Sequence, residues 1–311
     1  MKKRLFLAGA AFAALIAGRA MAADLTALVY AVPVAPIGWS GFYVGLNAGG
    51  TWSSTNDIAI STVPVTTFGG MPEIFITHGN PAAASASGVL GLGRKAGFVG
   101  GGQVGYNWQL NSFVAGLETD IQGVIGRGGG SLNASTGIAL VGPGSVATGT
   151  PDVTTFNGAK NLDYLGTVRA RFGYLASPTL LAYATGGLAY GNVSGSAGFT
   201  TTNPAYPAIG FGPTWGTANF FSATRAGWTL GAGFEWMFAP SFSVKAEYLY
   251  YDLGSVTYVL GSSGAVALPG FVGAGSQWFT NASTVSTRYS GNILRVGLNY
   301  HLGGLPGFPR F

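Results

Sequence analysis

Residues 227–254 carry the clearest pattern in the chain, a strict alternation of apolar residues with mainly small or polar ones. The apolar positions are Trp228, Leu230, Ala232, Phe234, Trp236 and Phe238, followed by Phe242, Val244, Ala246, Tyr248 and Tyr250. A period of two in two runs, separated by residues 239–241, predicts a β-hairpin. Because one face is apolar and the other mainly polar, we expect one face against lipid and the other toward a polar interior.

The same alternation predicts six further strands, at residues 41–52, 98–110, 113–123, 162–174, 180–191 and 292–302. Four long segments rich in Gly, Ser and Thr alternate with three tight turns, at residues 111–112, 175–179 and 239–241. This order predicts an all-β fold, an eight-stranded antiparallel up-and-down transmembrane β-barrel with four long external loops. Backbone polar groups in lipid must all be paired, so such a chain has to close on itself.

The first 22 residues have the composition of a secretory signal peptide. Lys2, Lys3 and Arg4 precede a short apolar stretch, and residues 20–22 fit an A-x-A cleavage site. The apolar stretch is too short to span a bilayer, and we find no run of about 18 apolar residues elsewhere. We therefore predict a signal peptide at residues 1–22, a periplasmic lead-in at 23–38, an outer-membrane β-barrel at 39–302 and a short periplasmic tail at 303–311.

Composition narrows the function further. The chain has 311 residues, of which only 8% are charged and 53 are glycine, and its mean hydropathy is +0.36. Without the four basic residues of the predicted signal peptide, 11 basic and 10 acidic residues remain. No basic excess is left that would favour a nucleic acid. The absence of cysteine excludes disulfides, and with them zinc or redox sites built on thiolates.

Six segments together carry a resemblance to a known family. They are WSGFYVGLNAGGTW (39–52), YLGTVRARFGY (164–174), ATGGLAYG (184–191), GWTLGAGFEW (227–236), VKAEYLYYDLG (244–254) and NILRVGLNY (292–300). In combination they resemble the porin-family outer-membrane β-barrel proteins of Gram-negative bacteria, which have a barrel like the OmpA transmembrane domain. The resemblance implies an abundant surface protein and antigen of the cell outer membrane, and some members of the family are linked to haem binding or adhesion.

The resemblance also implies the partners of the protein. They are outer-membrane lipid and lipopolysaccharide, the barrel-assembly machinery, and an extracellular ligand or host surface reached through the loops. No nucleic acid is among them, and the oligomeric state stays open. Only nine residues follow Leu302, too few for a peptidoglycan-binding domain. Because the family usually ends its last strand on an aromatic residue, both Leu302 and Phe311 are candidates for the end of the assembly signal.

We predict no enzyme and no catalytic, cofactor or metal site. His78 lies in the first long loop and His301 ends the last strand, so the two histidines of the chain should lie on opposite sides of the membrane. Neither a G-x-S-x-G elbow nor an H-E-x-x-H metal pair is present. The glycines at 100, 102 and 105 match a dinucleotide fingerprint by letter, but they lie inside a predicted strand with no helix after it.

Eight charged side chains are predicted to point into the barrel. They are Glu118, Asp120, Arg169, Arg171, Glu235, Lys245, Glu247 and Arg295. Four acids and four bases would suit an ion pathway or gate. An eight-stranded barrel, however, has an interior just filled by side chains, and charges buried there must pair. We therefore favour a structural ion cluster in the lumen, with Glu235 paired to Lys245 across the hairpin.

Three functions are compatible with these patterns. The first is a non-enzymatic outer-membrane surface protein that contributes to envelope structure, adhesion or recognition through its external loops. The second is a narrow passive porin for ions or small solutes. The third is a surface ligand receptor, with haem as the ligand that the resemblance implies. Aromatic or ligating groups for it would come from the loops, namely His78, Tyr206, Trp215, Trp278 and Tyr289.

Overall fold

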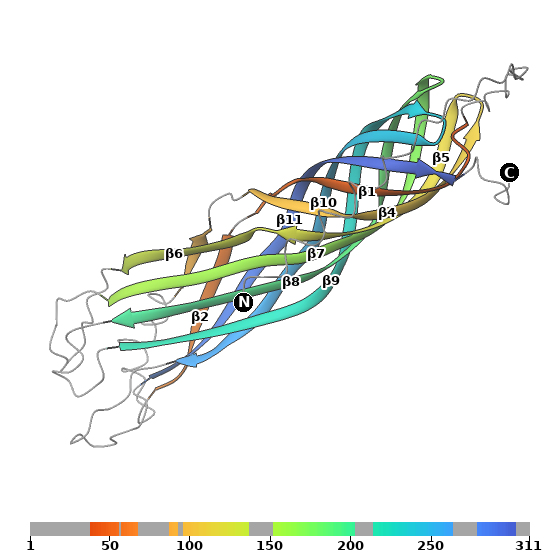
Figure 1. Cartoon of the computed structure of the whole chain (residues 1–311). Helices are drawn as coiled ribbons and strands as arrows, with labels where there is room; N and C mark the ends of the chain where they lie inside the picture. Colours follow the sequence, from red (N-terminus) through yellow and green to blue (C-terminus); the bar gives the residue numbers. More distant parts are fainter. Residues whose placement is uncertain are drawn as a thin grey trace, which may run out of the picture. The chain divides into compact units, whose positions relative to one another are not determined.

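A closed ring of eight antiparallel strands is the centre of the computed structural model (Figure 1). The ring runs β1-β4-β5-β7-β8-β9-β10-β11, and β11 pairs back with β1. The predicted eight-stranded up-and-down barrel is therefore confirmed. The predicted signal peptide and the tail at 303–311 lie outside the described residues. The structure describes residues 38–55, 57–67, 87–92, 96–136, 152–202, 214–263 and 279–302.

The ring strands are longer than predicted and extend mostly on the side away from the tight turns. They are β1 (Gly41–Ser53), β4 (Ala96–Leu110), β5 (Phe113–Ile125), β7 (Asp152–Ser177), β8 (Leu180–Thr202), β9 (Thr214–Ala239), β10 (Phe242–Ser263) and β11 (Phe279–His301). The tight turns lie at residues 111–112, 178–179 and 240–241. In the first turn Asn111 has a φ of 55°, a left-handed conformation that asparagine adopts more readily than most residues.

Side chains alternate between the two faces of the ring as predicted. Leu46, Leu117 and Phe234 point outward and are 69%, 54% and 62% exposed, whereas the residue after each of them is buried. Leu162 is an exception, because a bulge between it and Tyr164 turns it inward against apolar residues. Among the described residues, no helix is long and apolar enough to cross a membrane.

Beyond the ring, the long strands continue as two four-stranded sheets that share one core. Three extra strands, β2 (Asp57–Thr67), β3 (Gly88–Gly91) and β6 (Arg127–Thr136), lie in segments predicted as loops. One sheet has the order β6-β7-β8-β9 and the other the order β10-β11-β2-β3. The shared core consists of Ile58, Ile60, Leu90, Leu92, Phe156, Ala197, Phe199, Trp215, Leu260 and Val285. The external segments thus contain more strand than the lipid-type alternation predicted, and we call this part the outer sandwich.

The two sheets separate between β9 and β10. Within the described residues, backbone pairing of these strands ends at Trp228 and Asp252. Just beyond, Gly254 has a φ of 79° in a bulge of β10, and its N–H donates to Asp252 Oδ1 at 2.9 Å. Past the bulge, side chains of β9 form hydrogen bonds to β10 in place of the backbone pairing. Carbonyl oxygens of Leu260, Val259 and Ser255 accept hydrogen bonds of 2.9–3.0 Å from Thr217, Asn219 and Arg225 respectively.

Candidate functional site

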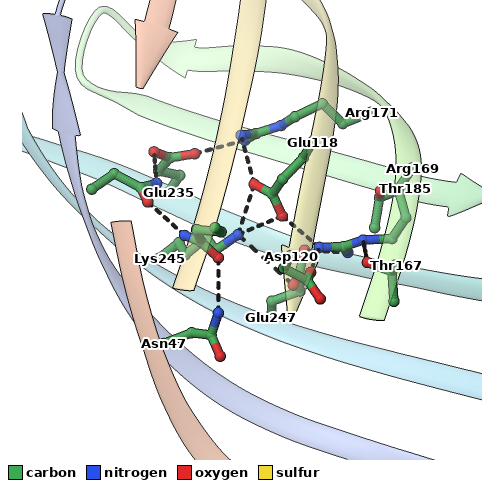
Figure 2. A network of polar contacts seen from close by, with 12 residues as sticks. Asn47, Glu118, Asp120, Thr167, Arg169, Arg171, Thr185, Glu235, Lys245 and Glu247 are labelled. Atoms are coloured by element: carbon green, nitrogen blue, oxygen red, sulfur yellow. Dashed lines mark hydrogen bonds and ion pairs between the residues drawn. The ribbon is translucent and has the colours of Figure 1, made fainter. Parts of the chain in front are cut away.

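The structure brings the eight predicted interior charges together in one cluster inside the ring. β5 carries Glu118 and Asp120, and β7 carries Arg169 and Arg171. The others are Glu235 on β9, Lys245 and Glu247 on β10, and Arg295 on β11. All eight side chains are exposed by 3% or less. Figure 2 labels all of them except Arg295 and shows the labelled side chains converging from different strands.

Arg169 holds three carboxylates at the centre of the cluster. Its Nη2 donates to Glu118 and, at 2.8 Å, to Asp120 Oδ2. Its Nη1 donates to Glu247 Oε1 at 3.0 Å. Because the planar guanidinium presents five N–H groups in fixed directions, one arginine can join acids on β5 and β10.

Lys245 and Arg295 provide two further links across the lumen. Lys245 Nζ lies 2.8 Å from both carboxylate oxygens of Glu118 on β5. Arg295 Nη2 lies 2.6 Å from Glu247 Oε2 and 2.8 Å from Asp120 Oδ2. Acids and bases therefore neutralise one another within the interior.

Arg171 and Glu235 form the part of the cluster nearest the tight turns. Arg171 Nη2 lies 2.6 Å from Glu235 Oε2, and its Nη1 donates to the Tyr43 hydroxyl at 3.0 Å. That hydroxyl in turn donates to Glu118 Oε2 at 2.6 Å. Asn299 Nδ2 donates a further hydrogen bond to Glu235 Oε1 at 2.7 Å.

The predicted ion pair between Glu235 and Lys245 is wrong, although their register is right. The two residues are opposite each other on β9 and β10. Glu235 nevertheless pairs with Arg171, while Lys245 pairs with Glu118. In a narrow closed barrel the facing wall is within reach of a long side chain, and strand register alone does not reveal that wall.

Ser243 and His301 form a contact that the sequence did not predict. Their Oγ and Nε2 atoms are 2.9 Å apart, and Ser243 Oγ donates to Glu235 Oε1 at 2.5 Å. Since the hydroxyl has one hydrogen and directs it to the carboxylate, His301 Nε2 must be the donor toward Ser243. A catalytic base would instead accept the serine hydrogen. This arrangement orients side chains and does not activate a nucleophile.

Trp39 covers the barrel interior at the end with the tight turns. Its side chain is fully buried, its indole N–H donates to the Pro178 carbonyl at 3.1 Å, and its backbone N–H donates to Gln109 Oε1 at 3.0 Å. It belongs to an apolar cluster with Val114, Leu181, Tyr183 and Met237. The ion cluster is thus flanked by an apolar layer on this side.

A second apolar layer flanks the ion cluster on the side of the outer sandwich. It consists of Val99, Leu165, Ala189, Val193, Leu249, Tyr251, Leu253, Tyr289 and Ile293. The core of the outer sandwich follows further along the same strands. The lumen is therefore filled in successive layers, of which alternation predicted only the charged one.

Lys160 is a buried cation between the second apolar layer and the sandwich core. Its Nζ donates to the carbonyl of Thr55 at 2.7 Å and to that of Arg288, and it lies 4.7 Å from the centre of the Tyr289 ring. No carboxylate of the described residues lies within 4.0 Å of it. Burial lowers the pKa of this amine from 10.5 to about 8, because the charged form loses its hydration.

The loop residues named as haem ligands do not gather in one described site. Trp215 lies in the sandwich core, and Tyr289 is buried with its hydroxyl donating to the Ser194 carbonyl at 2.9 Å. His78, Tyr206 and Trp278 lie outside the described residues. Within the described part of the chain, no three His, Asp or Glu residues are placed to hold a metal ion.

Among solved structures, the chain is similar to two small outer-membrane proteins. OprG from Pseudomonas aeruginosa is 11% identical with a TM-score of 0.33, and the match covers 84% of this chain and 97% of OprG. Neisserial surface protein A is 13% identical with a TM-score of 0.28, over 85% of this chain and 98% of that protein.

Sequence relatives extend over nearly the whole chain. The 31 kDa outer-membrane immunogenic proteins of Brucella melitensis and Brucella suis are each 33% identical over 296 residues, which are 94% of this chain and 97% of theirs. The 22 kDa outer membrane protein of Rhizobium leguminosarum is 30% identical over 164 residues, 52% of this chain and 56% of its own. The model of the outer membrane protein beta-barrel domain matches residues 10–301. With its closed ring of eight strands, the chain is an outer-membrane protein and belongs to the outer membrane protein beta-barrel domain family.

Proposed function

We propose that this outer-membrane protein is a non-enzymatic surface protein. Its barrel serves as a closed anchor, and its external strands and loops act in envelope structure, adhesion or recognition. The observation that carries the proposal is the filled lumen, in which eight charges with no net charge contact one another across the interior. A hydrated solute would have to displace these contacts, which are costly to break when buried.

The apolar layers support the same proposal. An ion that passed the charged layer would next meet the buried side chains around Leu249 and Ile293, which offer no hydration. Trp39 adds a cover at the opposite end. The Brucella relatives are described as immunogenic, which agrees with a role at the cell surface.

The chemistry of the polar interior supports a non-enzymatic role. Ser243 and His301 are the nearest approach to a nucleophile and a base in the described interior, and the direction of their hydrogen bonds does not activate the serine. They are also 0% and 6% exposed, beneath Trp39. No substrate would reach them without displacement of that side chain.

Single-channel recording in a planar bilayer tests the proposal. We expect the refolded wild-type protein to show no steps, or rare and small ones. Steady, ion-selective conductance would contradict the closed anchor and favour a narrow porin, with the eight charges along its path. A boiled sample of the same protein is the control for leak caused by detergent or lipid, because that leak survives boiling while a folded barrel does not.

A further inference from the structure

A groove lies on the outward face of the outer sandwich, across β7, β8 and β9. Its volume is about 740 Å³, and its lining includes Asn157, Ser196, Gly198, Thr200, Gly216 and Phe220. On β9, Phe220 lies eight residues from Trp228, the outward aromatic residue at which pairing with β10 ends. At about 3.3 Å per residue, this places the groove about 26 Å further along the strand. A tilted strand crosses the hydrocarbon layer in about 9–11 residues, and β9 already supplies this length between Phe238, next to the tight turn, and Trp228. The groove is therefore outside the hydrocarbon layer.

Small residues in register form the floor of the groove. Gly198 is opposite Ala218, and Thr200 is opposite Gly216. A Cβ at Gly198 would lie 2.6 Å from the Ala218 Cβ, so the two strands leave no room for a larger side chain there. Asn157, opposite Gly198 on β7, borders the floor on one side, and Phe220 follows two residues after Ala218 on β9.

The lining combines uncharged hydrogen-bonding groups with one exposed aromatic ring. Hydroxyls and an amide come from Asn157, Ser196, Thr200 and Thr214, and no described residue of the lining is acidic or basic. Phe220 is 78% exposed, the largest value of any large apolar side chain described. A sugar ring needs this combination, because its C–H face packs on an aromatic ring while its hydroxyls exchange hydrogen bonds with hydroxyl and amide groups.

We propose that this groove binds a neutral saccharide, the polysaccharide chain of lipopolysaccharide in the same membrane. The described residues of the lining carry no charge, which argues against phosphorylated or acidic sugars, because their charge would lose hydration without a partner. The direction in which the groove opens indicates where the saccharide comes from. The groove opens sideways from the sheet, whose other face is the sandwich core, so it faces molecules that stand beside the barrel. This proposal rests on the proposed recognition role of the external strands.

Calorimetric titration of the detergent-refolded protein tests the proposal. The probe is the neutral polysaccharide chain of the bacterium's own lipopolysaccharide, freed of lipid A by mild acid and separated from the charged core. We expect saturable binding by the wild type, about ten-fold weaker binding by Phe220→Ala, and none by Ala218→Leu, which fills the floor from an exposed position. Val259→Ala removes a 58% exposed apolar side chain from the other sheet and should bind like the wild type.

Three results would overturn the proposal. The first is that a wild type that still migrates as a folded barrel shows no saturable binding. The second is that all three variants bind the polysaccharide equally well. The third is that the phosphorylated core oligosaccharide binds more tightly than the neutral chain. Tighter binding of neutral host oligosaccharides would overturn the assignment to the cell's own polysaccharide. If Phe220→Ala changes the oligomeric mass of the protein but not its sugar binding, the groove binds a second copy of the chain instead. Conductance is independent of all these readings, so failure here leaves the closed anchor standing.

Discussion

Glu118 lies within 4.0 Å of all four bases of the ion cluster, one more charged partner than Arg169 or Glu247 has. It accepts hydrogen bonds from Lys245, Arg169 and the Tyr43 hydroxyl, which come from three different strands. Because the carboxylate is buried, loss of one partner leaves charge that water cannot reach. Single substitutions in this cluster should therefore cost more than compensated double substitutions.

Lys245→Met is expected to lower the free energy of unfolding by about 3 kcal/mol, because it removes a buried partner of Glu118. Adding Glu118→Gln should recover much of this loss, since a neutral amide no longer needs the ammonium. Adding Glu235→Gln instead should deepen the loss, because Glu235 is the partner of Arg171. Urea unfolding in lipid vesicles measures the three values. Rescue by Glu235→Gln rather than Glu118→Gln would refute the assigned pairs.

Lys160 predicts a pH dependence at the start of the outer sandwich. Its folded pKa of about 8 is below the unfolded value of 10.5, so the folded state releases the proton first as pH rises. Between these two values the unfolded state binds more protons, and the free energy of unfolding should increase with pH. Below pH 8 both states are charged and the desolvation cost is constant.

The difference in stability between wild type and Lys160→Met isolates this group. We expect the difference to shift in favour of the wild type from pH 8 to pH 10.5, by a few kcal/mol at most, and to be flat below pH 8. Urea unfolding at a series of pH values gives the curve. A difference that stays flat through pH 10.5 would show that the amine is hydrated in the folded protein.

At the scale of elements, the junction between β9 and β10 has a different construction from the rest of the ring. Between the tight turn and this junction, the two strands share a backbone ladder from Ala239 to Trp228. Above it, three side chains bond to β10 carbonyls in place of that ladder. Side-chain bonds order a strand edge less firmly than a continuous ladder, because each can break independently. This junction should be the place where the sandwich opens most readily.

Hydrogen exchange should resolve the junction. Amides of residues 218–226 that are not bonded to β8 should exchange at least roughly ten-fold faster than those of residues 229–235. The double variant Asn219→Ala with Arg225→Ala should speed exchange in residues 255–261 and leave residues 244–250 unchanged. Mass spectrometry after pulsed labelling in detergent gives both comparisons. Equal protection on the two sides of Trp228 would contradict a weaker junction.

At the scale of the whole molecule, the interior is closed several times in series. The cover at Trp39, the ion cluster, the apolar layer around Leu249 and the sandwich core each occupy the lumen. When several barriers lie one after another, the lumen stays closed to ions after one of them is removed. Loss of the ion cluster alone should therefore loosen the barrel without creating a path for ions.

The double variant Arg169→Ala with Glu247→Ala removes a base and an acid from the centre and keeps the cluster neutral. We expect reduced stability but almost no rise in bilayer conductance, because the apolar layer beyond it is intact. Addition of Tyr251→Ala and Ile293→Ala, which thins that layer, should raise the leak. A large leak in the first double variant would show that the charges alone close the lumen.

The sequence by itself determined the barrel and the membership of its charged layer. A period of two depends only on neighbours along the chain. The outward positions of Leu46 and Ala48 and the inward position of Arg169 therefore follow from the sequence pattern alone. The register of the hairpin, which places Glu235 opposite Lys245, was predicted from a turn at residues 239–241 with Phe238 opposite Phe242. In the structure Phe242 is opposite Ala239, and a bulge after it leads to the same register at Glu235 and Lys245.

Only the tertiary structure decided which charges meet and what fills the rest of the interior. Lys245 pairs with Glu118 because closure of the ring brings β5 and β10 face to face, which no local pattern encodes. The sequence pattern did not predict the outer sandwich, for a related reason. Its core residues, such as Phe156 and Trp215, come from segments far apart in sequence and pack inward, while their outward neighbours are small and polar rather than lipid-facing. Burial between two sheets, not contact with lipid, makes those segments strands.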